Sequence, residues 1–178
     1  MPRKLTLFVL FNAAIAVIAL YCARNVWATP ASGFVGKTVA VGRFGDIDVF
    51  NHAILPDPDR EGDNGKAWIS WQKTKGASDV YVQNNIWGLG GSTGWHSHPG
   101  HSLIIVTAGA VTAYEGNDPE CKPTVYTKGM GFVDPGGDHV HILRNEGTVI
   151  AQTIAVQLIP AGAARRIDVV PSPGNCPF

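Results

Sequence analysis

Between residues 103 and 158 short β-type runs alternate with turn residues, and this alternation restricts the fold more than any other feature. The run Leu103–Ala108 is almost continuously apolar, as expected for a strand covered on both faces. Gly109 permits a turn, and Ala110–Tyr114 returns as the partner strand. Further β segments are expected at Thr124–Tyr126, Gly131–Val133, His139–Arg144 and Thr148–Leu158. Residues 29–160 contain no convincing helical period, so the sequence predicts an all-β sandwich or barrel.

The first half of the chain has fewer turn signals, but four earlier segments also have β character. They lie at Thr38–Arg43, Ile47–Phe50, Lys66–Lys73 and Asp79–Trp87. A polar loop over residues 55–65, rich in Asp, Pro and Gly, separates the second from the third. In the third segment, strand alternation places Trp68 and Ser70 on one face and Ile69 and Trp71 on the other.

Length and charge limit the domain count and the class of partner. The 178 residues are enough for one domain with a sizeable core. Fourteen Lys and Arg residues balance fourteen Asp and Glu residues, and there is no basic run. The chain therefore lacks the electrostatic pattern of a nucleic-acid-binding protein, and we expect no nucleic-acid partner.

Residues 1–28 have the pattern of a signal peptide. Arg3 and Lys4 precede an apolar run over residues 5–23, and Val26 and Ala28 occupy the two positions that a signal peptidase reads. Cleavage after Ala28 would leave residues 29–178 as an exported domain, periplasmic or extracellular, with no membrane contact. The alternative is an uncleaved segment that anchors the protein through residues 5–23, because a run of this length can span a bilayer.

Two cysteines remain once the signal segment is set aside. Cys121 lies in a turn-rich stretch, and Cys176 is close to the last residue. An even pair of cysteines in an exported chain favours a disulfide, which would hold the C-terminal tail against a turn of the barrel. The alternative is two free thiols.

Histidines are concentrated between residues 96 and 141. His96 and His98 are separated by one residue, so on a strand both side chains point to the same face and can enter the barrel. Two imidazoles in an apolar interior are costly unless each finds a partner, and a shared divalent metal would satisfy both. His141 begins or continues a later β segment and can supply a third ligand. His52 is interpreted as an ordinary core or surface residue.

Two motifs containing these histidines resemble those of the cupin superfamily. Gly90, five residues, His96-Ser97-His98, and then Gly109 are similar to the first cupin motif. The stretch from Pro135 through His141 to Asn145 is similar to the second, with one extra residue before the histidine. The resemblance covers about residues 90–160. It implies a double-stranded β-helix, the jelly-roll barrel of cupins, with a metal held by His96, His98 and His141.

One position departs from the family pattern. Cupins usually carry a glutamate ligand four residues after the second histidine, and that residue is Ser102 here. Either the site has three histidines only, as in some cupin-type dioxygenases, or His101 rotates inward as a fourth ligand despite its strand parity. His139 lies two residues before His141 and is a further candidate for a ligand or for a donor to a ligand.

Three neutral imidazoles leave the charge of a divalent ion uncompensated, so such a site should prefer an anionic or chelating small molecule. The resemblance implies a metal-dependent dioxygenase or other oxidoreductase as the leading hypothesis. Imidazole ligands suit Zn, Cu, Fe and Ni, oxygen chemistry would call for Fe, and Mn also stays open. The rival hypothesis is a non-catalytic exported cupin that captures a metal or small ligand, because no general base is visible near the motifs. A homodimer would form by exchange or pairing of an N-terminal strand.

Overall fold

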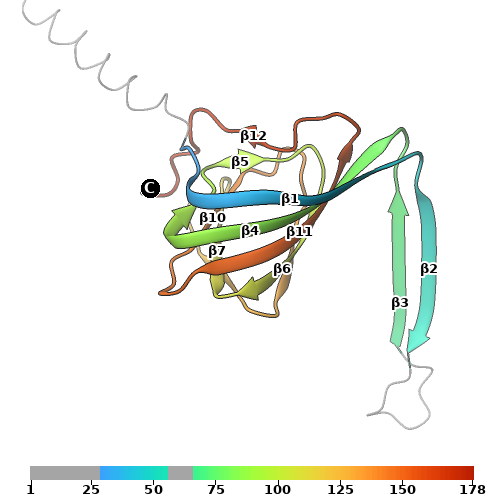
Figure 1. Cartoon of the computed structure of the whole chain (residues 1–178), viewed down its shortest axis with the longest axis horizontal. Helices are drawn as coiled ribbons and strands as arrows, with labels where there is room; N and C mark the ends of the chain where they lie inside the picture. Colours follow the sequence, from blue (N-terminus) through green and yellow to red (C-terminus); the bar gives the residue numbers. More distant parts are fainter. Residues whose placement is uncertain (1–28, 56–65) are drawn as a thin grey trace, which may run out of the picture.

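Figure 1 shows a barrel from which one long hairpin projects. The structure is a computed structural model that describes residues 29–55 and 66–178, so the predicted signal segment lies outside the described residues. The strands are β1 (Ser32–Phe44), β2 (Asp48–Leu55), β3 (Lys66–Lys73), β4 (Ser78–Ser92), β5 (His96–Ser97), β6 (Ser102–Ala108), β7 (Ala110–Glu115), β8 (Thr124–Thr127), β9 (Gly131–Asp134), β10 (His141–Arg144), β11 (Ala151–Pro160) and β12 (Ile167–Asp168). These two ranges contain no helix, and hence no helix with the length and apolar character needed to cross a membrane.

Ten of the strands form one antiparallel sheet that curls into a nearly closed barrel. Its order is β12-β5-β10-β4-β11-β6-β9, with β1 also paired to β4, and β7 paired to both β10 and β8. The long central strand β4 is paired with β1 from Ser78 to Ser92 on one side and with β11 from Ser78 to Trp87 on the other. The predicted all-β fold is therefore confirmed, and it is a jelly-roll barrel.

Most expected segments match strands, with differences at their ends. The segments predicted after residue 103 correspond to β6–β11, but β10 begins at His141, so His139 precedes the strand that was expected to contain it. The strands β5 and β12 have two residues each, too few for a periodicity argument to find. Both of these short strands lie next to the histidines.

Two apolar clusters are buried, one inside the barrel and the other on the outer side of the sheet beneath the C-terminal segment. The first is centred on Trp87 and packs Val106 and Val111 from the β6–β7 hairpin against it. The second is centred on Trp95, whose neighbours Tyr114 and Ile142 are also buried. Trp95 precedes His96 and points to the opposite side of the sheet, so its role is packing.

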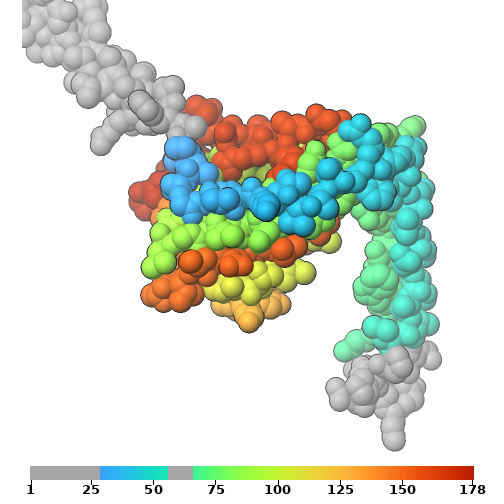
Figure 2. Space-filling view, viewed as in Figure 1, coloured from blue at the N-terminus to red at the C-terminus, as the bar shows by residue number. Residues whose placement is uncertain are grey.

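The hairpin β2–β3 is separate from the barrel sheet. Its two strands pair only with each other, and in Figure 2 the hairpin stands clear of the barrel apart from its base. The cross-strand register places Phe50 opposite Trp71 and His52 opposite Ile69, so the predicted alternation in this segment is confirmed. We call residues 48–55 and 66–73 the β arm.

Candidate metal centre

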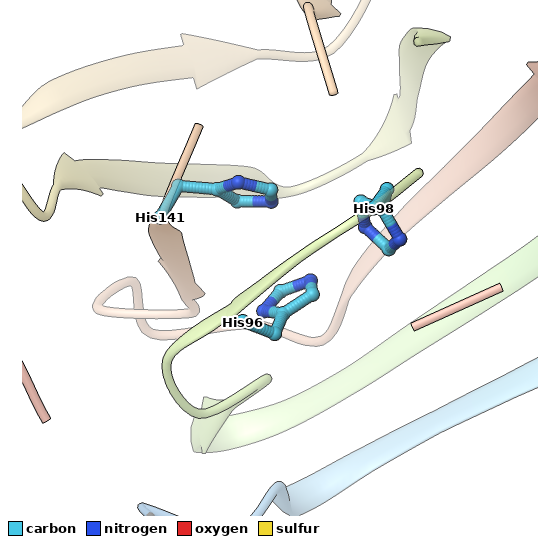
Figure 3. Close-up of side chains that lie close together, drawn as sticks. All are labelled: His96, His98 and His141. Carbon is cyan, nitrogen blue, oxygen red and sulfur yellow. The ribbon is translucent and has the colours of Figure 1, made fainter. Parts of the chain in front are cut away.

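His96, His98 and His141 come together inside the barrel. His96 is in β5, His98 follows that strand directly, and His141 opens β10, which pairs antiparallel with β5 so that His141 is the register partner of His96. One ring nitrogen from each residue lies within 4.8 Å of the others, and the rings face one another in Figure 3. Nitrogens bound to one ion at about 2.1 Å lie at most about 4.2 Å apart, so a small inward movement of the rings would close the site.

Backbone carbonyls fix which nitrogen is free in two of the three imidazoles. Nδ1 of His96 donates to the carbonyl of Gly94 at 2.8 Å, and Nδ1 of His98 donates to the carbonyl of Arg165 at 2.5 Å. A carbonyl can only accept, so Nδ1 carries the proton in both rings and Nε2 keeps its lone pair. This is the arrangement that metal-binding histidines adopt, with the far nitrogen oriented by a hydrogen bond.

Burial keeps the three rings neutral. It lowers the pKa of His96 well below its usual value of 6.5, with further lowering from the charges of His141, Arg166 and His98. Burial likewise lowers the pKa of His98, and it lowers that of His141 to about 4 although the charge of Asp134 opposes the shift. Neutral imidazoles are the form that binds metal, so at neutral pH the donor set needs no deprotonation.

The histidines of the first motif and of the second thus share one interior site in an antiparallel jelly-roll barrel. This arrangement is the one that the resemblance to cupins predicted. Ser102, at the position where cupins usually carry glutamate, is buried, and its strand partner across β6–β9 is Asp134. His101 lies outside the group of three, beside clefts on the outer side of the barrel. Nothing in the structure turns its side chain toward the histidine site.

Comparisons with known proteins find only distant likenesses. No family model matches the sequence, and no curated protein matches it. Among solved structures, an oxalate oxidase is similar at 20% identity over 46% of this chain and 46% of its own, with a TM-score of 0.39. A cupin superfamily protein from Desulfitobacterium hafniense is 13% identical over 62% and 78%, with a TM-score of 0.39. A predicted oxalate decarboxylase from Thermotoga maritima is 18% identical over 48% and 83%, with a TM-score of 0.37. The chain spans less than half of the oxalate oxidase.

A small cavity adjoins the three histidines. It measures about 80 Å³, and apolar side chains of the barrel core line it together with polar side chains from β4 and β11 and with Arg165 and Arg166. Nη2 of Arg166 is buried there without a hydrogen-bond partner in the described chain, and so is Nε1 of Trp87. The arginines were not found from the sequence, because they lie beyond the second motif in a stretch with no clear strand pattern.

Asp134, at the end of β9, forms a second cluster behind the first. Its carboxylate is 3.3 Å from Nδ1 of His139 and 3.7 Å from Nδ1 of His141, and all three residues can offer ligand atoms to one ion. Nε2 of His139 in turn lies 2.5 Å from a carboxylate oxygen of Glu115. His139 therefore contacts Asp134 and Glu115 and is not part of the group formed by His96, His98 and His141.

The C-terminal segment closes the site. A disulfide joins Cys121 to Cys176, as the sequence predicted, and both sulfur-bearing residues pack on the Trp95 cluster. In the same C-terminal segment, before Cys176, strand β12 pairs with β5 and places Asp168 opposite His96. The same segment supplies the Arg165 carbonyl to His98 and the Arg166 side chain to the cavity. A disulfide of this kind is compatible with an exported protein.

Proposed function

We propose that this cupin binds one divalent transition metal through His96, His98 and His141 and acts on a small anionic or chelating molecule as a metal-dependent oxidoreductase. The observation that carries the proposal is the convergence of three neutral, buried imidazoles beside a cavity. Three protein nitrogens leave coordination positions open, as catalytic metal sites require. When bound, the metal supplies Lewis-acid and redox chemistry, and its identity among Fe, Zn, Cu, Mn and Ni is to be measured.

The cavity favours an anion over a neutral molecule. Nε of Arg166 pairs with Asp168 at 2.6 Å, but its Nη2 and the indole N–H of Trp87 are donors without an acceptor, and a buried donor left in this state is unfavourable. A carboxylate or enolate oxygen would satisfy them while a second oxygen reaches the histidine site. The volume of about 80 Å³ admits roughly five or six water-sized groups, so the molecule is short.

Calorimetric titration tests the proposal. The protein is loaded with Zn²⁺, and glycolate and its neutral amide analogue are titrated separately. We expect the acid to bind at least tenfold more tightly than the amide, and this preference to shrink in Arg166→Gln. Arg144→Gln, which removes an arginine that contacts Glu146 on the outside of the barrel, is the matched control. Failure of Zn²⁺ to bind, or equal affinity for acid and amide, would contradict the proposal.

One observation favours capture without turnover as the alternative. No Asp or Glu occurs among the described residues that line the cavity, so no carboxylate there can act as a general base. Oxygen uptake separates the two functions. Protein loaded with Fe²⁺ consumes oxygen with a panel of short enols and 2-hydroxy acids if it is an oxidoreductase, and consumes none if it only binds them.

Export is part of the same proposal. The Cys121–Cys176 disulfide and the signal-type pattern of residues 1–28 support secretion to the periplasm or the extracellular space. N-terminal sequencing of protein recovered from the exported fraction tests this. A first residue of Thr29 would agree with cleavage after Ala28, whereas an intact N-terminus found in the membrane fraction would favour the anchor.

A further inference from the structure

Asp134 is a buried carboxylate that is only partly satisfied. It is 3% exposed, and its Oδ1 accepts a hydrogen bond from the backbone N–H of Gly136 at 3.0 Å. Its Oδ2 is buried and has no hydrogen-bond partner among the described residues. A buried carboxylate oxygen of this kind is stable only when a cation or a donor compensates it.

The unsatisfied oxygen points to the histidine site. Oδ2 of Asp134 lies 3.5 Å from Nε2 of His98, the nitrogen that the Arg165 carbonyl leaves free. Two ligand atoms that share one ion at about 2.1 Å are separated by about 3 to 3.5 Å when the angle between them is 90–110°. The observed separation matches that of two neighbouring ligands of one metal, and Asp134 also lies in a ligand group with His139 and His141.

The strand register explains how Asp134 reaches this position. On β6 the inward-facing position usually held by glutamate in cupins is Ser102, and its partner on the adjacent strand β9 is Asp134. Residues opposite each other on paired strands point to the same face, with Cβ atoms about 4.5–5.5 Å apart. A carboxylate on β9 thus enters the barrel beside the place where a longer side chain on β6 would enter it.

We propose that Asp134 is the fourth protein ligand of the metal centre, bound through Oδ2, in place of the carboxylate absent at Ser102. His139 is a positioning residue, because its Nδ1 contacts Oδ1 of Asp134 while Nε2 contacts Glu115, which leaves Oδ2 directed at His98. The centre then carries three imidazoles and one carboxylate, and its net charge stays positive. This inference depends on the proposed metal binding at the three histidines.

Metal affinity and cobalt absorption test the assignment. Zn²⁺ dissociation constants are measured by competition with a chelator, and the d–d spectrum of the Co²⁺ form reports the ligand set. Loss of a residue that only supports a ligand commonly costs 10- to 100-fold in affinity, so Asp134→Asn should cost at least about 100-fold and alter the cobalt spectrum. The control Asp138→Asn removes an exposed carboxylate of the same segment and should change neither. Ser102→Glu added to Asp134→Asn should recover most of the affinity.

Three results would overturn the inference. An Asp134→Asn affinity within threefold of the parent would exclude a ligand role, and so would a weaker affinity with an unchanged cobalt spectrum, which would show a positioning residue. If the variant does not fold, a crystal structure of the metal-loaded parent decides: a distance from Oδ2 to the metal below about 2.5 Å supports the inference and one above 3 Å refutes it. A parent protein that binds no Zn²⁺ would refute the proposed function itself.

A different observation supports a second inference, about the β arm. One of its faces carries Phe50, Ile54, Ile69 and Trp71, each more than 60% exposed, around a single polar side chain, His52. An isolated two-stranded hairpin is at best marginally stable in water and needs a further layer on its apolar face. The structure gives the arm no such layer within the described chain (Figure 2).

The barrel has an uncovered apolar strip of its own. Register partners place Val133, Leu103, Val156 and Val82 side by side on the outer face of β9, β6, β11 and β4. Three of the four are exposed, and the strip contains no charged residue. A cleft of about 600 Å³ separates this face from the base of the arm and is lined by residues of both, among them Val49, Leu103 and Val156.

We infer that the arm of one copy packs across this strip on a second copy, and the reverse contact is made at the same time. Large apolar side chains expose about 200 Å² when free, so the four on the arm face present roughly 500 Å². Two reciprocal contacts, counted on both surfaces, bury about 2,000 Å², which is the range of stable homodimers. A second copy is favoured over another partner because one chain carries both complementary surfaces, and a two-fold axis uses each of them once.

Sedimentation equilibrium of residues 29–178 tests this inference. The parent should be a dimer at micromolar concentration, and Phe50→Lys with Trp71→Lys should make it a monomer. Leu103→Lys on the barrel strip should do the same, and Val149→Ser, an exposed apolar residue between β10 and β11, should leave the dimer intact. A monomeric parent at 50 µM, a larger assembly, or arm variants that remain dimeric would refute it.

Discussion

Removing the disulfide should destabilise the protein by an amount that the loop length sets. In the variant Cys121→Ala, Cys176→Ala the cross-link across 55 residues is lost. On the chain-entropy account, a loop of this length contributes roughly 4 kcal/mol to the free energy of unfolding at 25 °C. The bond also seals the Trp95 cluster, and the tail it fixes includes Asn175, whose side chain donates to the carbonyls of Glu115 and Asp118. We therefore expect a loss of about 4 kcal/mol, with most of it from the cross-link.

Urea unfolding of parent and variant, both without metal, measures this difference. The variant should also unfold with a larger dependence on urea, because its denatured state is no longer cross-linked and exposes more surface. The parent treated with reductant is the control and should behave as the double variant does. A loss below 1 kcal/mol, or a reduced parent that stays as stable as the oxidised one, would refute the reasoning, because the tail would then be held by its other contacts alone.

Three further predictions concern the centre and its support. Asn145→Ala should lower the free energy of unfolding by about 3 kcal/mol, because this fully buried side chain donates to the carbonyls of Trp87, Gly88 and Val149. Denaturant unfolding measures the loss, with Asn145→Gln as the comparison. The metal-free protein should lose stability as the pH falls from about 6.5 to about 4. Folding lowers the pKa of His141, so in this pH range the unfolded chain binds more protons than the folded one. Thermal unfolding across the range measures the loss, and His141→Gln should reduce it. Zn²⁺ at a hundred times its dissociation constant should stabilise the parent by about 2.7 kcal/mol and His141→Gln by far less, measured as the same thermal shift.

The sequence predicted the barrel because its strands are bounded by Gly and Pro turns. Periodicity located β6, β7 and β11 closely, since each is long enough to show alternation or a continuous apolar run. It missed β5 and β12, whose pairing depends on contacts between distant parts of the chain. It also gave no sign that β2 and β3 would leave the barrel, because the alternation of a free hairpin is the same as that of a strand in a sheet.

The candidate site was partly predictable for a related reason. His96 and His98 share a face by spacing alone, and the motif resemblance added His141. Asp134 and Arg166 carry no local signal, because what brings them to the site is the register of β9 against β6 and the return of the C-terminal segment to β5. Spacing along the chain finds ligands that share a strand, whereas ligands brought in by a neighbouring strand require the register.

The return of the C-terminal segment also sets the order in which the centre can be assembled. Both histidine motifs are synthesised well before Arg165, yet the carbonyl that orients His98 arrives only when β12 docks on β5. A chain emerging from the ribosome or a translocation channel therefore holds its histidines without their final orientation. Under the proposed function, metal loading would follow the completion of folding, and the ion acquired would be the one available in the compartment where Cys121 and Cys176 become oxidised.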